Sequence, residues 1–425
     1  MKTKRYINLN DEKKETTLFL ICWFIYFCIY TGRLNYSAAM VQMVNDGFIT
    51  KTSGGLIATF FFAAYGFGQT FMGFAGDKLS SFKMLLFGSA LSSLCNFLMP
   101  ALFHGNMAAM CVIWGINGIS QSVMWSPIIR IISQIISPER RFKASIYIST
   151  SVPAGTLFTY ILSMALLKYF TWKSVFYFAG IVISTAFAAL LVYFISNKKD
   201  FITEETKKNE SETKPKNAYA ANSGNGKMIL GVLSILLFPV IVHGMLKDSM
   251  TTWFPVYLTE IHDMAPYMAV MLTAVMPAVN FAGIYAAKWI YGKTKSNEFI
   301  SCGIFFAICV CGFALMALIG QHNLYLSVIF AAAGTASMSA VNCIVISVLP
   351  IHFGKRGFAS TITGSLNSAI YAGCSVSMAA SGQLVEKYGW AAIIYIWCML
   401  AAVGVLLCVS LNNIWLKMKN KILKN

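Results

Sequence analysis

Residues 16–36 read TTLFLICWFIYFCIYTGRLNY, and this stretch decides the fold class. It contains a single charged side chain, that of Arg33, and it has the roughly 20-residue length that an α-helix needs to cross a lipid bilayer. A strand of a membrane barrel would alternate in polarity over about ten residues, and this run does not. The stretch therefore predicts a transmembrane helix.

Eleven further apolar stretches of similar length follow along the 425-residue chain. The twelve predicted spans are 16–36, 54–75, 83–103, 107–132, 143–167, 173–195, 228–258, 264–287, 299–319, 324–349, 357–384 and 390–412. Of all residues, 57% are hydrophobic and only 12% are charged, against about 25% charged in a soluble domain. This composition argues against a soluble enzyme, a secreted disulfide scaffold and a disordered chain. The sequence predicts an all-α membrane protein with twelve transmembrane helices.

The basic residues fall on one side of the predicted membrane. The net charge is +17, from 33 Lys and Arg residues against 16 Asp and Glu residues. With the N-terminus inside, the cytoplasmic segments hold 26 of those 33, and the outer loops hold only Lys51, Lys168, Lys173 and Lys387. This positive-inside pattern predicts a multi-pass plasma (inner) membrane protein with both termini and the polar linker at 197–227 in the cytoplasm. The charge is thus assigned to topology in the lipid bilayer, and no nucleic-acid partner is expected.

Neither the cysteines nor the histidines have the spacing of a metal site. All eleven cysteines fall inside predicted spans without a C-x-x-C pair, and the five histidines are scattered. The sequence also lacks a Walker lysine motif, a nucleophile elbow and a metalloprotease motif. We therefore expect no disulfide, no metal, no cofactor, no enzyme active site and no ATP-driven transport.

The two halves of the chain carry similar charged landmarks at similar spacing. Arg33 and Lys247 each lie late in the first span of a half, and Arg141 and Arg356 each lie in a later loop that leads into a span. The separation in sequence between Arg33 and Arg141 nearly equals that between Lys247 and Arg356, which indicates an internal duplication. Two bundles related by a pseudo-twofold axis would place a substrate site where they meet near the middle of the membrane. The predicted domains are an N-terminal six-helix bundle at 1–196, a cytoplasmic linker at 197–227 and a C-terminal six-helix bundle at 228–425.

The loop between the second and third predicted spans reads GFAGDKLSSFK at 73–83. It resembles the signature loop of the major facilitator superfamily, G-x-x-x-D-[RK]-x-x-x-[RK]-[RK]. The resemblance implies the fold of that superfamily, in which two six-helix bundles are related by a pseudo-twofold axis. The equivalent loop of the second half contains Gly292 and Lys293 without the acid, so a gating role rests mainly on the first half.

Asp77 of this loop is the candidate gating acid. We expect it to hold the cytoplasmic side closed by engaging a basic group or the N-terminus of the eleventh span. The candidate basic groups are Arg130, Arg140 and Arg141 of the same half, and Arg356 lies in the matching loop of the other half. Arg130 has a second interpretation, because a cation near the end of a span can instead snorkel to the headgroup region or contact a loop.

Three further motifs carry a narrower resemblance. They read AYGFGQTFMG at 64–73, QSVMWSPIIR at 121–130 and KDSMTTWFPVYL at 247–258. Together they resemble the organophosphate:inorganic-phosphate antiporter family, the glycerol phosphate and hexose phosphate transporters of the superfamily. The resemblance implies a small anionic substrate, inorganic phosphate as a counter-substrate, no cofactor and a monomer.

A charge in the hydrocarbon core is costly, so each such residue is a functional candidate. Apart from lysines at the first position of a span, the charged residues within the predicted spans are Arg33, Arg130, Lys247 and Asp248. A pseudo-twofold axis would bring Arg33 and Lys247 together across a central cavity, where a guanidinium suits carboxylate or phosphate oxygens. In the alternative interpretation, each cation pairs structurally with a helix C-terminus or with Asp248. Further candidates for the lining of this substrate site are Tyr65, Gln69, Trp125, Ser151 and His243.

The candidate site departs from the family at three positions. The antiporters that resemble this chain have a lysine where it has Gln69 and a histidine where it has Ser151, and Lys247 replaces their second-half arginine. The site thus keeps two cations and loses two basic groups. A carboxylate fits this set as well as a phosphate ester does.

Asp248 and His243 are the candidate groups for proton coupling, because proton symport uses a titratable group inside the membrane. His243 could be a ligand or a proton carrier, and a hydrogen-bonded packing role is an equal alternative. The leading hypothesis is a secondary transporter that moves a small organic anion, such as an organophosphate or sugar phosphate exchanged for phosphate, by alternating access. The alternatives are a transporter-like membrane sensor of such an anion and a proton-coupled symporter of a carboxylate. The two cations argue against an efflux pump for cationic drugs.

Overall fold

The computed structural model describes residues 12–75, 79–101, 106–134, 136–137, 140, 143–144, 147–197, 223–356 and 359–424. Within these ranges the chain folds almost entirely into helices and forms no strand. Ten helical stretches of the described chain are long and apolar enough to cross a membrane. The prediction of an all-α membrane protein is confirmed.

The helices of the first half follow the first six predicted spans. They are α1 (Glu12–Asn45), α2 (Lys51–Ala75), α3 (Ser81–Ala101), α4 (Met107–Ser122), α5 (Trp125–Gln134), α7 (Ser151–Tyr169) and α8 (Trp172–Ser196). The fourth span is broken into α4 and α5 just before Pro127, because a proline cannot donate to the carbonyl four residues earlier and its ring crowds that carbonyl. The helix of the fifth span starts at Ser151, later than predicted, with Pro153 in its first turn.

The helices of the second half follow the other six predicted spans. They are α10 (Ser223–Ile261), α11 (Pro266–Thr273), α12 (Val275–Lys293), α13 (Glu298–Leu318), α14 (Leu324–Asn342), a π-helical turn (Cys343–Val348), a 3₁₀ segment (Leu349–Arg356) and α15 (Ala359–Lys424). The eleventh and twelfth spans are joined in α15, which turns at Gly389, where φ is 77°. The ten apolar stretches count α15 once and leave out α2. Since α15 supplies two spans and α2 is long enough to supply one, the described helices account for twelve crossings.

Two helix boundaries in the second half differ from the sequence prediction. The structure begins α10 at Ser223, inside the stretch predicted as the linker at 197–227. Most of that linker lies outside the described residues. At the other end, α15 continues to Lys424, past the predicted end of the twelfth span at 412. The polar start of α10 and the Lys-rich end of α15 extend beyond the apolar stretches that a hydropathy argument detects.

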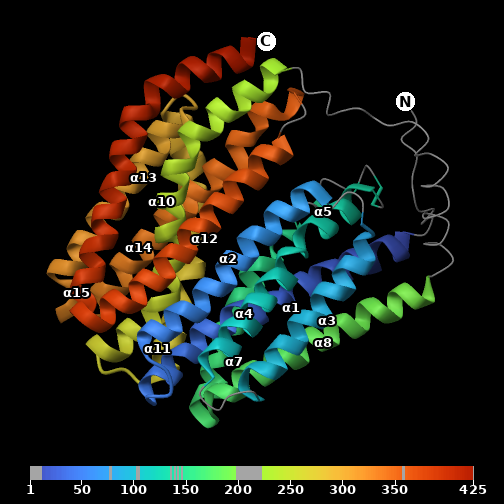
Figure 1. Cartoon of the computed structure of the whole chain (residues 1–425), viewed down its shortest axis with the longest axis vertical. Helices are drawn as coiled ribbons and strands as arrows, with labels where there is room; N and C mark the ends of the chain where they lie inside the picture. Colours follow the sequence, from blue (N-terminus) through green and yellow to red (C-terminus); the bar gives the residue numbers. More distant parts are fainter. Residues whose placement is uncertain are drawn as a thin grey trace.

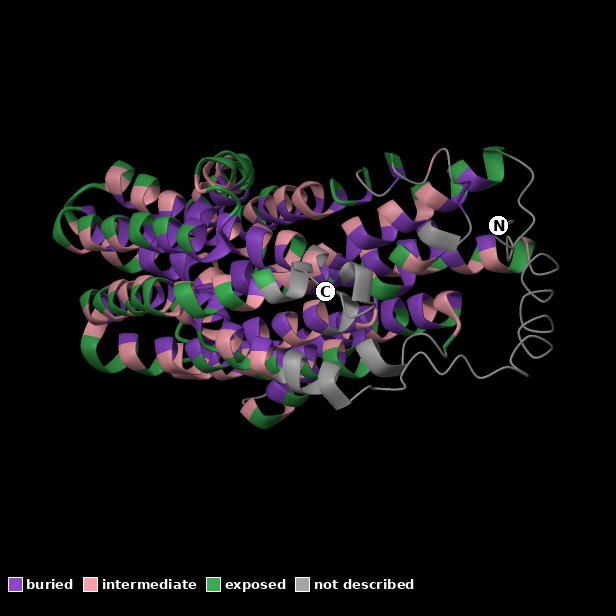
Figure 2. Cartoon of the chain, turned by 90° about the horizontal axis from the view of Figure 1, so that it is seen from above, coloured by how far each residue is buried: buried purple, intermediate pink, exposed green. Residues whose placement is uncertain are grey.

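The helices group into two bundles (Figure 1). In the first, α1 packs along α7 and α8, while α2 and α3 pack along α4. In the second, α10 and α13 pack along α15, and α14 packs along α12 and α13. Viewed from above, the buried residues lie in the interior of each bundle and the exposed ones on its outer surface (Figure 2). The main contact between the bundles is that of α2 with the first part of α15.

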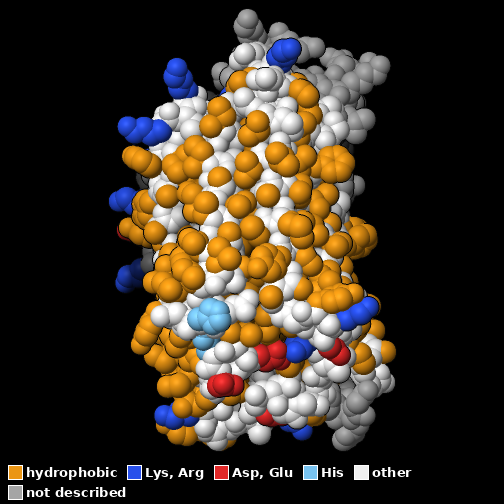
Figure 3. Space-filling model, turned by 90° about the vertical axis from the view of Figure 1, so that its left-hand side faces the viewer, with side chains coloured by type: hydrophobic (Ala, Val, Ile, Leu, Met, Phe, Trp, Pro, Cys, Tyr) orange, Lys and Arg blue, Asp and Glu red, His pale blue; other side chains and the backbone are white. Residues whose placement is uncertain are grey.

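The outer surface of the bundles is apolar. Figure 3 shows one face covered by hydrophobic side chains, with acidic and histidine side chains gathered toward its lower end. Large apolar side chains such as Phe238 and Leu406 are 66% and 68% exposed. An apolar surface of this extent is what lipid tails cover in a membrane protein, so the exposed residues need no partner chain.

The same kind of glycine contact occurs inside each bundle. In the first, Gly155 of α7 faces the backbone carbonyl of Phe27 on α1 so closely that a Cβ atom would collide with it. In the second, Gly373 of α15 faces the carbonyl of Ile241 on α10 in the same way. The separation in sequence between Phe27 and Ile241 is the same as that between Arg33 and Lys247. The duplicated architecture therefore extends to individual helix contacts.

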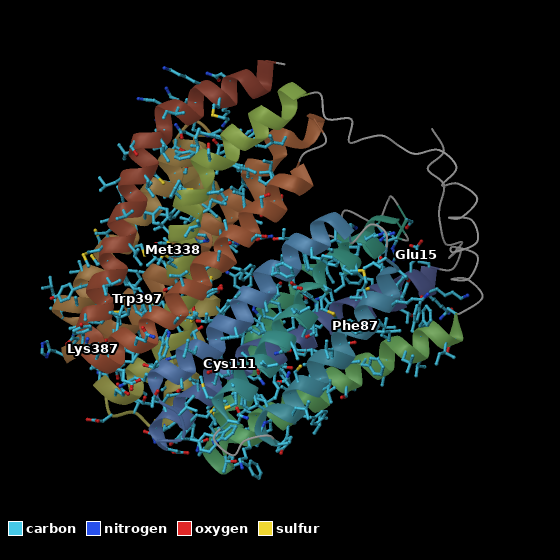
Figure 4. The ribbon with its side chains drawn as sticks, viewed as in Figure 1. Glu15, Phe87, Cys111, Met338, Lys387 and Trp397 are labelled. Atoms are coloured by element: carbon cyan, nitrogen blue, oxygen red, sulfur yellow. The ribbon has the colours of Figure 1, made fainter. Side chains whose placement is uncertain are left out.

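The two bundles meet at one end of the molecule and diverge toward the other (Figure 1). We call the first the closed end; it holds the connections at 46–50, 262–265 and the turn at Gly389. The other, the terminal end, holds the start of α1 and the end of α15 (Figure 1). Figure 4 shows Lys387 toward the closed end and Glu15 toward the terminal end.

Gly373→Ala should destabilise the second bundle. The added methyl group meets the Ile241 carbonyl, so α10 and α15 must separate, and overpacking of this kind costs about 1–3 kcal/mol. Thermal unfolding of the purified protein in detergent measures the effect as a lower melting temperature. Gly364→Ala is the matched control, because in the described structure no atom outside its own helical turn lies within 4 Å of its added Cβ. Equal melting temperatures for the two variants would contradict the close contact.

Candidate functional site

Arg33 lies where the two bundles meet, surrounded by aromatic rings. Its guanidinium carbon is 4.6 Å from the centre of the Tyr65 ring and 5.5 Å from that of Tyr371. The rings of Phe61, Phe62 and Tyr30 lie 5.8, 5.9 and 5.9 Å away. Rings at this distance attract a cation through their quadrupoles, and they replace part of the hydration that the guanidinium loses. We call these five rings the aromatic cage.

One hydrogen bond from Arg33 crosses between the bundles. Its Nη2 donates to the hydroxyl of Tyr371 on α15 at 3.1 Å. A guanidinium has five N–H donors, so most of them remain for a ligand. Among the described residues no carboxylate lies within ion-pair distance of Arg33. A half-buried cation in this state is suited to bind an anion.

Lys247 of the second bundle has an acidic partner. Its Nζ lies 3.3 and 3.4 Å from the two carboxylate oxygens of Asp248. The thiol of Cys374 on α15 also lies 3.3 Å from Asp248. The lysine and aspartate side chains are 24% and 22% exposed, so the pair is accessible. This arrangement is the pairing with Asp248 that the sequence left open for Lys247.

Arg33 and Asp248 line the same small cavity. Its volume is about 40 Å³, and Thr251 and Thr252 of α10 complete the wall of the second bundle. Next to it, Ser37 of α1 donates to the carbonyl of Thr252 at 3.0 Å. A cavity of this size holds one or two water molecules, so the bundles are packed tightly on this side of the site.

The other predicted lining residues make different kinds of contact. Tyr65 stacks on Arg33, as described. Gln69 donates to the Ser122 carbonyl at 3.0 Å, and the Trp125 ring lies 4.7 Å from the Tyr26 ring. Both of these side chains therefore bridge helices of the first bundle.

Ser151 and His243 are fully buried. The Ser151 hydroxyl donates to the Ile148 carbonyl at 2.5 Å, within its own chain segment. The His243 ring lies 3.5 Å from the Asn342 amide oxygen of α14, and its Nδ1 atom has no hydrogen-bond partner among the described residues. Both side chains face bundle interiors, while Tyr65, Arg33, Lys247 and Asp248 converge between the bundles.

Sequence reasoning missed Tyr371, Tyr30 and the two cage phenylalanines. Tyr30 precedes Arg33 by three residues, so helical spacing puts it on a neighbouring face of α1, and this signal was readable. Tyr371 lies far away in the chain, among many aromatic residues. Aromatic residues form 14% of the sequence and are common in membrane helices, so composition could not single it out.

The structure describes only some of the candidate gating residues. Asp77, Arg141 and the side chain of Arg356 lie outside the described residues. Arg130 donates to the carbonyl of Leu79 at 2.9 Å, in the loop that contains Asp77. Arg140 lies 3.3 Å from the carboxylate of Glu12. The loop contact proposed for Arg130 is thus the one that the structure contains.

The closed end is held by polar contacts that the sequence did not predict. Lys51 of α2 lies 2.9 Å from the Glu260 carboxylate of α10, and Trp390 of α15 donates to the same carboxylate at 2.7 Å. Nearby, the backbone N–H of Thr52 donates to Glu386 at 2.8 Å. We call Lys51, Glu260 and Trp390 the latch. Because it joins α2 to α10 and α15, it connects the two bundles.

Comparison with known proteins gives a consistent picture. The family model described as "Major Facilitator Superfamily" matches residues 22–370. The glycerol-3-phosphate transporter of Bacillus subtilis (strain 168) is 23% identical over 70% of this chain and 71% of its own length. A membrane sensor protein of Escherichia coli (strain K12) is 24% identical over 42% of this chain and 39% of its own. The crystal structure of a nucleoside transporter superposes with a TM-score of 0.71 at 13% identity, over 93% of this chain and 99% of that one.

Lys51→Met should weaken the closed end. The Lys51–Glu260 pair is partly exposed, so its loss shifts the opening equilibrium by at most about 1 kcal/mol, or about fivefold. Spin labels at positions 46 and 263, in a background where exposed Cys311 is replaced by Ser, measure the separation of the bundles at this end. We expect a larger fraction of long distances. Lys387→Met, a lysine at the same end without an acidic partner in the described structure, should leave the distribution unchanged.

Proposed function

The chain belongs to the Major Facilitator Superfamily, and from that premise we propose that it carries a small organic anion across the membrane by alternating access. The observation that carries this proposal is Arg33, a cation held between the bundles with free donors and no carboxylate partner among the described residues. A charge at this depth is costly, and a function that uses it explains its presence. The chain is not an enzyme, and the glycerol-3-phosphate transporter and the nucleoside transporter that it resembles are transporters.

Arg33 is also placed to couple binding to motion. It lies on α1 of the first bundle, and its Tyr371 partner lies on α15 of the second. A ligand can shift a conformational equilibrium only through contacts that differ between the two states. An anion bound by Arg33 and by groups of α10 or α15 makes such contacts, because the bundles move relative to each other during transport.

The finer substrate assignment is an organophosphate or sugar phosphate exchanged for inorganic phosphate. The glycerol-3-phosphate transporter among its relatives supports this class. Gln69 and Ser151 stand where the antiporters have basic residues. A carboxylate therefore fits the proposed site as well as a phosphate ester does. Proton symport would require a titratable group in the site, and Asp248 is the candidate that faces it. Exchange is favoured because Asp248 is already engaged by Lys247.

The positive-inside pattern assigns the terminal end to the cytoplasm. The latch then lies on the outer side, and in the described conformation the bundles diverge toward the cytoplasmic side (Figure 1). In the opposite conformation the loop at 73–83 would approach the second bundle. Asp77, together with Arg130, Arg141 or Arg356, would then close the cytoplasmic side.

A second candidate function is that of a membrane sensor, which binds the same anion and signals to a partner. The sensor protein among the relatives supports it. Flux measurements separate the two, because a sensor binds the anion without moving it at a comparable rate.

Arg33→Ala should abolish transport without unfolding the protein. Losing a charge-assisted contact to a desolvated anion costs about 2–5 kcal/mol, which is more than tenfold in affinity. The assay is uptake of glycerol 3-phosphate into proteoliposomes that are either loaded with phosphate or empty. Arg33→Lys should also impair uptake, because an ammonium group cannot form the bidentate contact. Lys173→Ala, at the exposed start of α8, is the control. Normal affinity in well-folded Arg33→Ala protein would eliminate the anion site.

Asp77→Asn should slow turnover and leave substrate affinity within a few-fold. The acid is proposed to stabilise one end state of the cycle and not to touch the substrate, so its loss changes the rate of exchange between states. Initial uptake rates and ligand titration on the same preparation separate the two effects. A normal transport rate would show the gating assignment to be wrong.

A further inference from the structure

The two halves of the duplication differ in charge at the site. The repeat that relates Arg33 to Lys247 also relates the next residue of each half, so that Leu34 corresponds to Asp248. The first bundle therefore presents a cation beside a leucine, and the second presents a cation beside an acid. Leu34 and Asp248 line the same cavity, so this difference lies within the binding region.

Asp248 offsets the charge of Lys247. Both carboxylate oxygens lie within 3.4 Å of the lysine Nζ, and the Cys374 thiol lies beside them. The other acids near the interface, Glu260 and Glu386, belong to the closed end and contact Lys51 and Thr52 there. With two cations and one carboxylate, the described site has a formal charge of +1.

Arg33 is the cation of this set that has no carboxylate within ion-pair distance in the described structure, although it shares a cavity with Asp248. One of its donors is used by the Tyr371 hydroxyl, and the aromatic cage offers π faces and hydroxyl groups but no negative charge. The cage also keeps water from part of the guanidinium surface. At low hydration, the repulsion between the Asp248 carboxylate and a second negative charge on a ligand is stronger than it would be in bulk water.

We propose that the site selects ligands that carry one negative charge, and that Asp248 sets this selectivity. A dianion would place its second charge close to the Asp248 carboxylate, where like charges disfavour each other. A carboxylate, a phosphodiester and the singly protonated form of a phosphate monoester all have the required charge. The inference rests on the proposed function and adds the charge state of the substrate to it.

The test compares two ligands with the same body. Glycerol 3-phosphate is a monoester with a second pKa of about 6, and its methyl ester is a diester with a single charge at all relevant pH values. Between pH 7.5 and 5.5 the singly charged fraction of the monoester rises about twentyfold, given that pKa. Isothermal titration of the purified wild-type protein should show the apparent affinity for glycerol 3-phosphate rising by a similar factor.

The methyl ester serves as the internal control for the protein. Its charge does not change between the two pH values, so any change in its affinity reports titration of the protein itself. The ionisable groups near Asp248 in the described structure are Lys247, Cys374, Arg33, Tyr371, Tyr160 and His243. We expect the affinity for the methyl ester to stay within about twofold, and at pH 7.5 to exceed that for glycerol 3-phosphate.

Variants then assign the selectivity to Asp248. Asp248→Asn leaves Lys247 uncompensated and should strengthen glycerol 3-phosphate binding at pH 7.5 by about tenfold, the effect of about 1.4 kcal/mol. Asp248→Glu retains the charge and should retain the wild-type ranking. Asp263→Asn removes an acid from the exposed turn at the closed end and should change neither affinity; Asn also tolerates the positive φ of 49° there. If Asp248→Asn does not fold, the pH comparison on the wild-type protein decides.

The outcomes are distinct. Tighter binding of the methyl ester at pH 7.5, together with the expected gain for the monoester at pH 5.5, supports the proposal. Equal or tighter binding of glycerol 3-phosphate at pH 7.5, with no gain at pH 5.5, overturns it and leaves the proposed function standing. If neither compound binds, and glycerate does not bind either, the proposed function fails and the charge selectivity fails with it.

Discussion

A guanidinium held between two membrane-embedded bundles without a carboxylate partner in the described structure is the constraint on which the rest of the molecule depends. Such a group loses hydration that must be replaced. Here the replacement is aromatic: five rings surround Arg33, and the Tyr371 hydroxyl accepts one of its hydrogen bonds. Since the rings come from both bundles, the cage forms only when α1, α2 and α15 are packed together. The local stability of the charge and the docking of the two halves are therefore one property.

This docking requires rigid bundles and a seal on one side. Within each bundle, glycines allow backbones to approach directly, as Gly155 does against Phe27 and Gly373 against Ile241. In membranes, close packing of this kind takes the place of the hydrophobic effect. Between the bundles, α2 and α15 also approach through a glycine, as Gly55 does against the Met378 carbonyl, and the latch adds polar contacts at the closed end. Movement of the bundles as units therefore requires these contacts to separate while those inside each bundle persist.

The fold was largely predictable from the sequence, and the site only in part. Apolar length and the alternation of basic loops predict the spans, because the bilayer imposes both. Arg33 and Lys247 could be singled out because a charge in a span is rare. The partner of Arg33 could not, because Tyr371 resembles many other tyrosines until α15 is placed against α2. The roles of Ser151 and His243 were equally hidden, since hydropathy does not tell which side of a helix faces the other bundle and which faces its own bundle interior.

Divergence of the two duplicated halves explains why the site is asymmetric. Two copies of one bundle would present two equal cations to the axis, and a symmetric site of that kind has no preferred orientation for a small ligand. Divergence at one position, with Leu34 in the first half and Asp248 in the second, makes the two sides unequal. In the proposed site the anionic group would have Arg33 as its favourable partner, and the body of the ligand would extend toward the second bundle. A transporter that must transmit binding from one bundle to the other benefits from this polarity, because each bundle then contacts a different part of the ligand. The neutralised lysine is thus part of the recognition, since it gives the second bundle polar groups without a competing net charge.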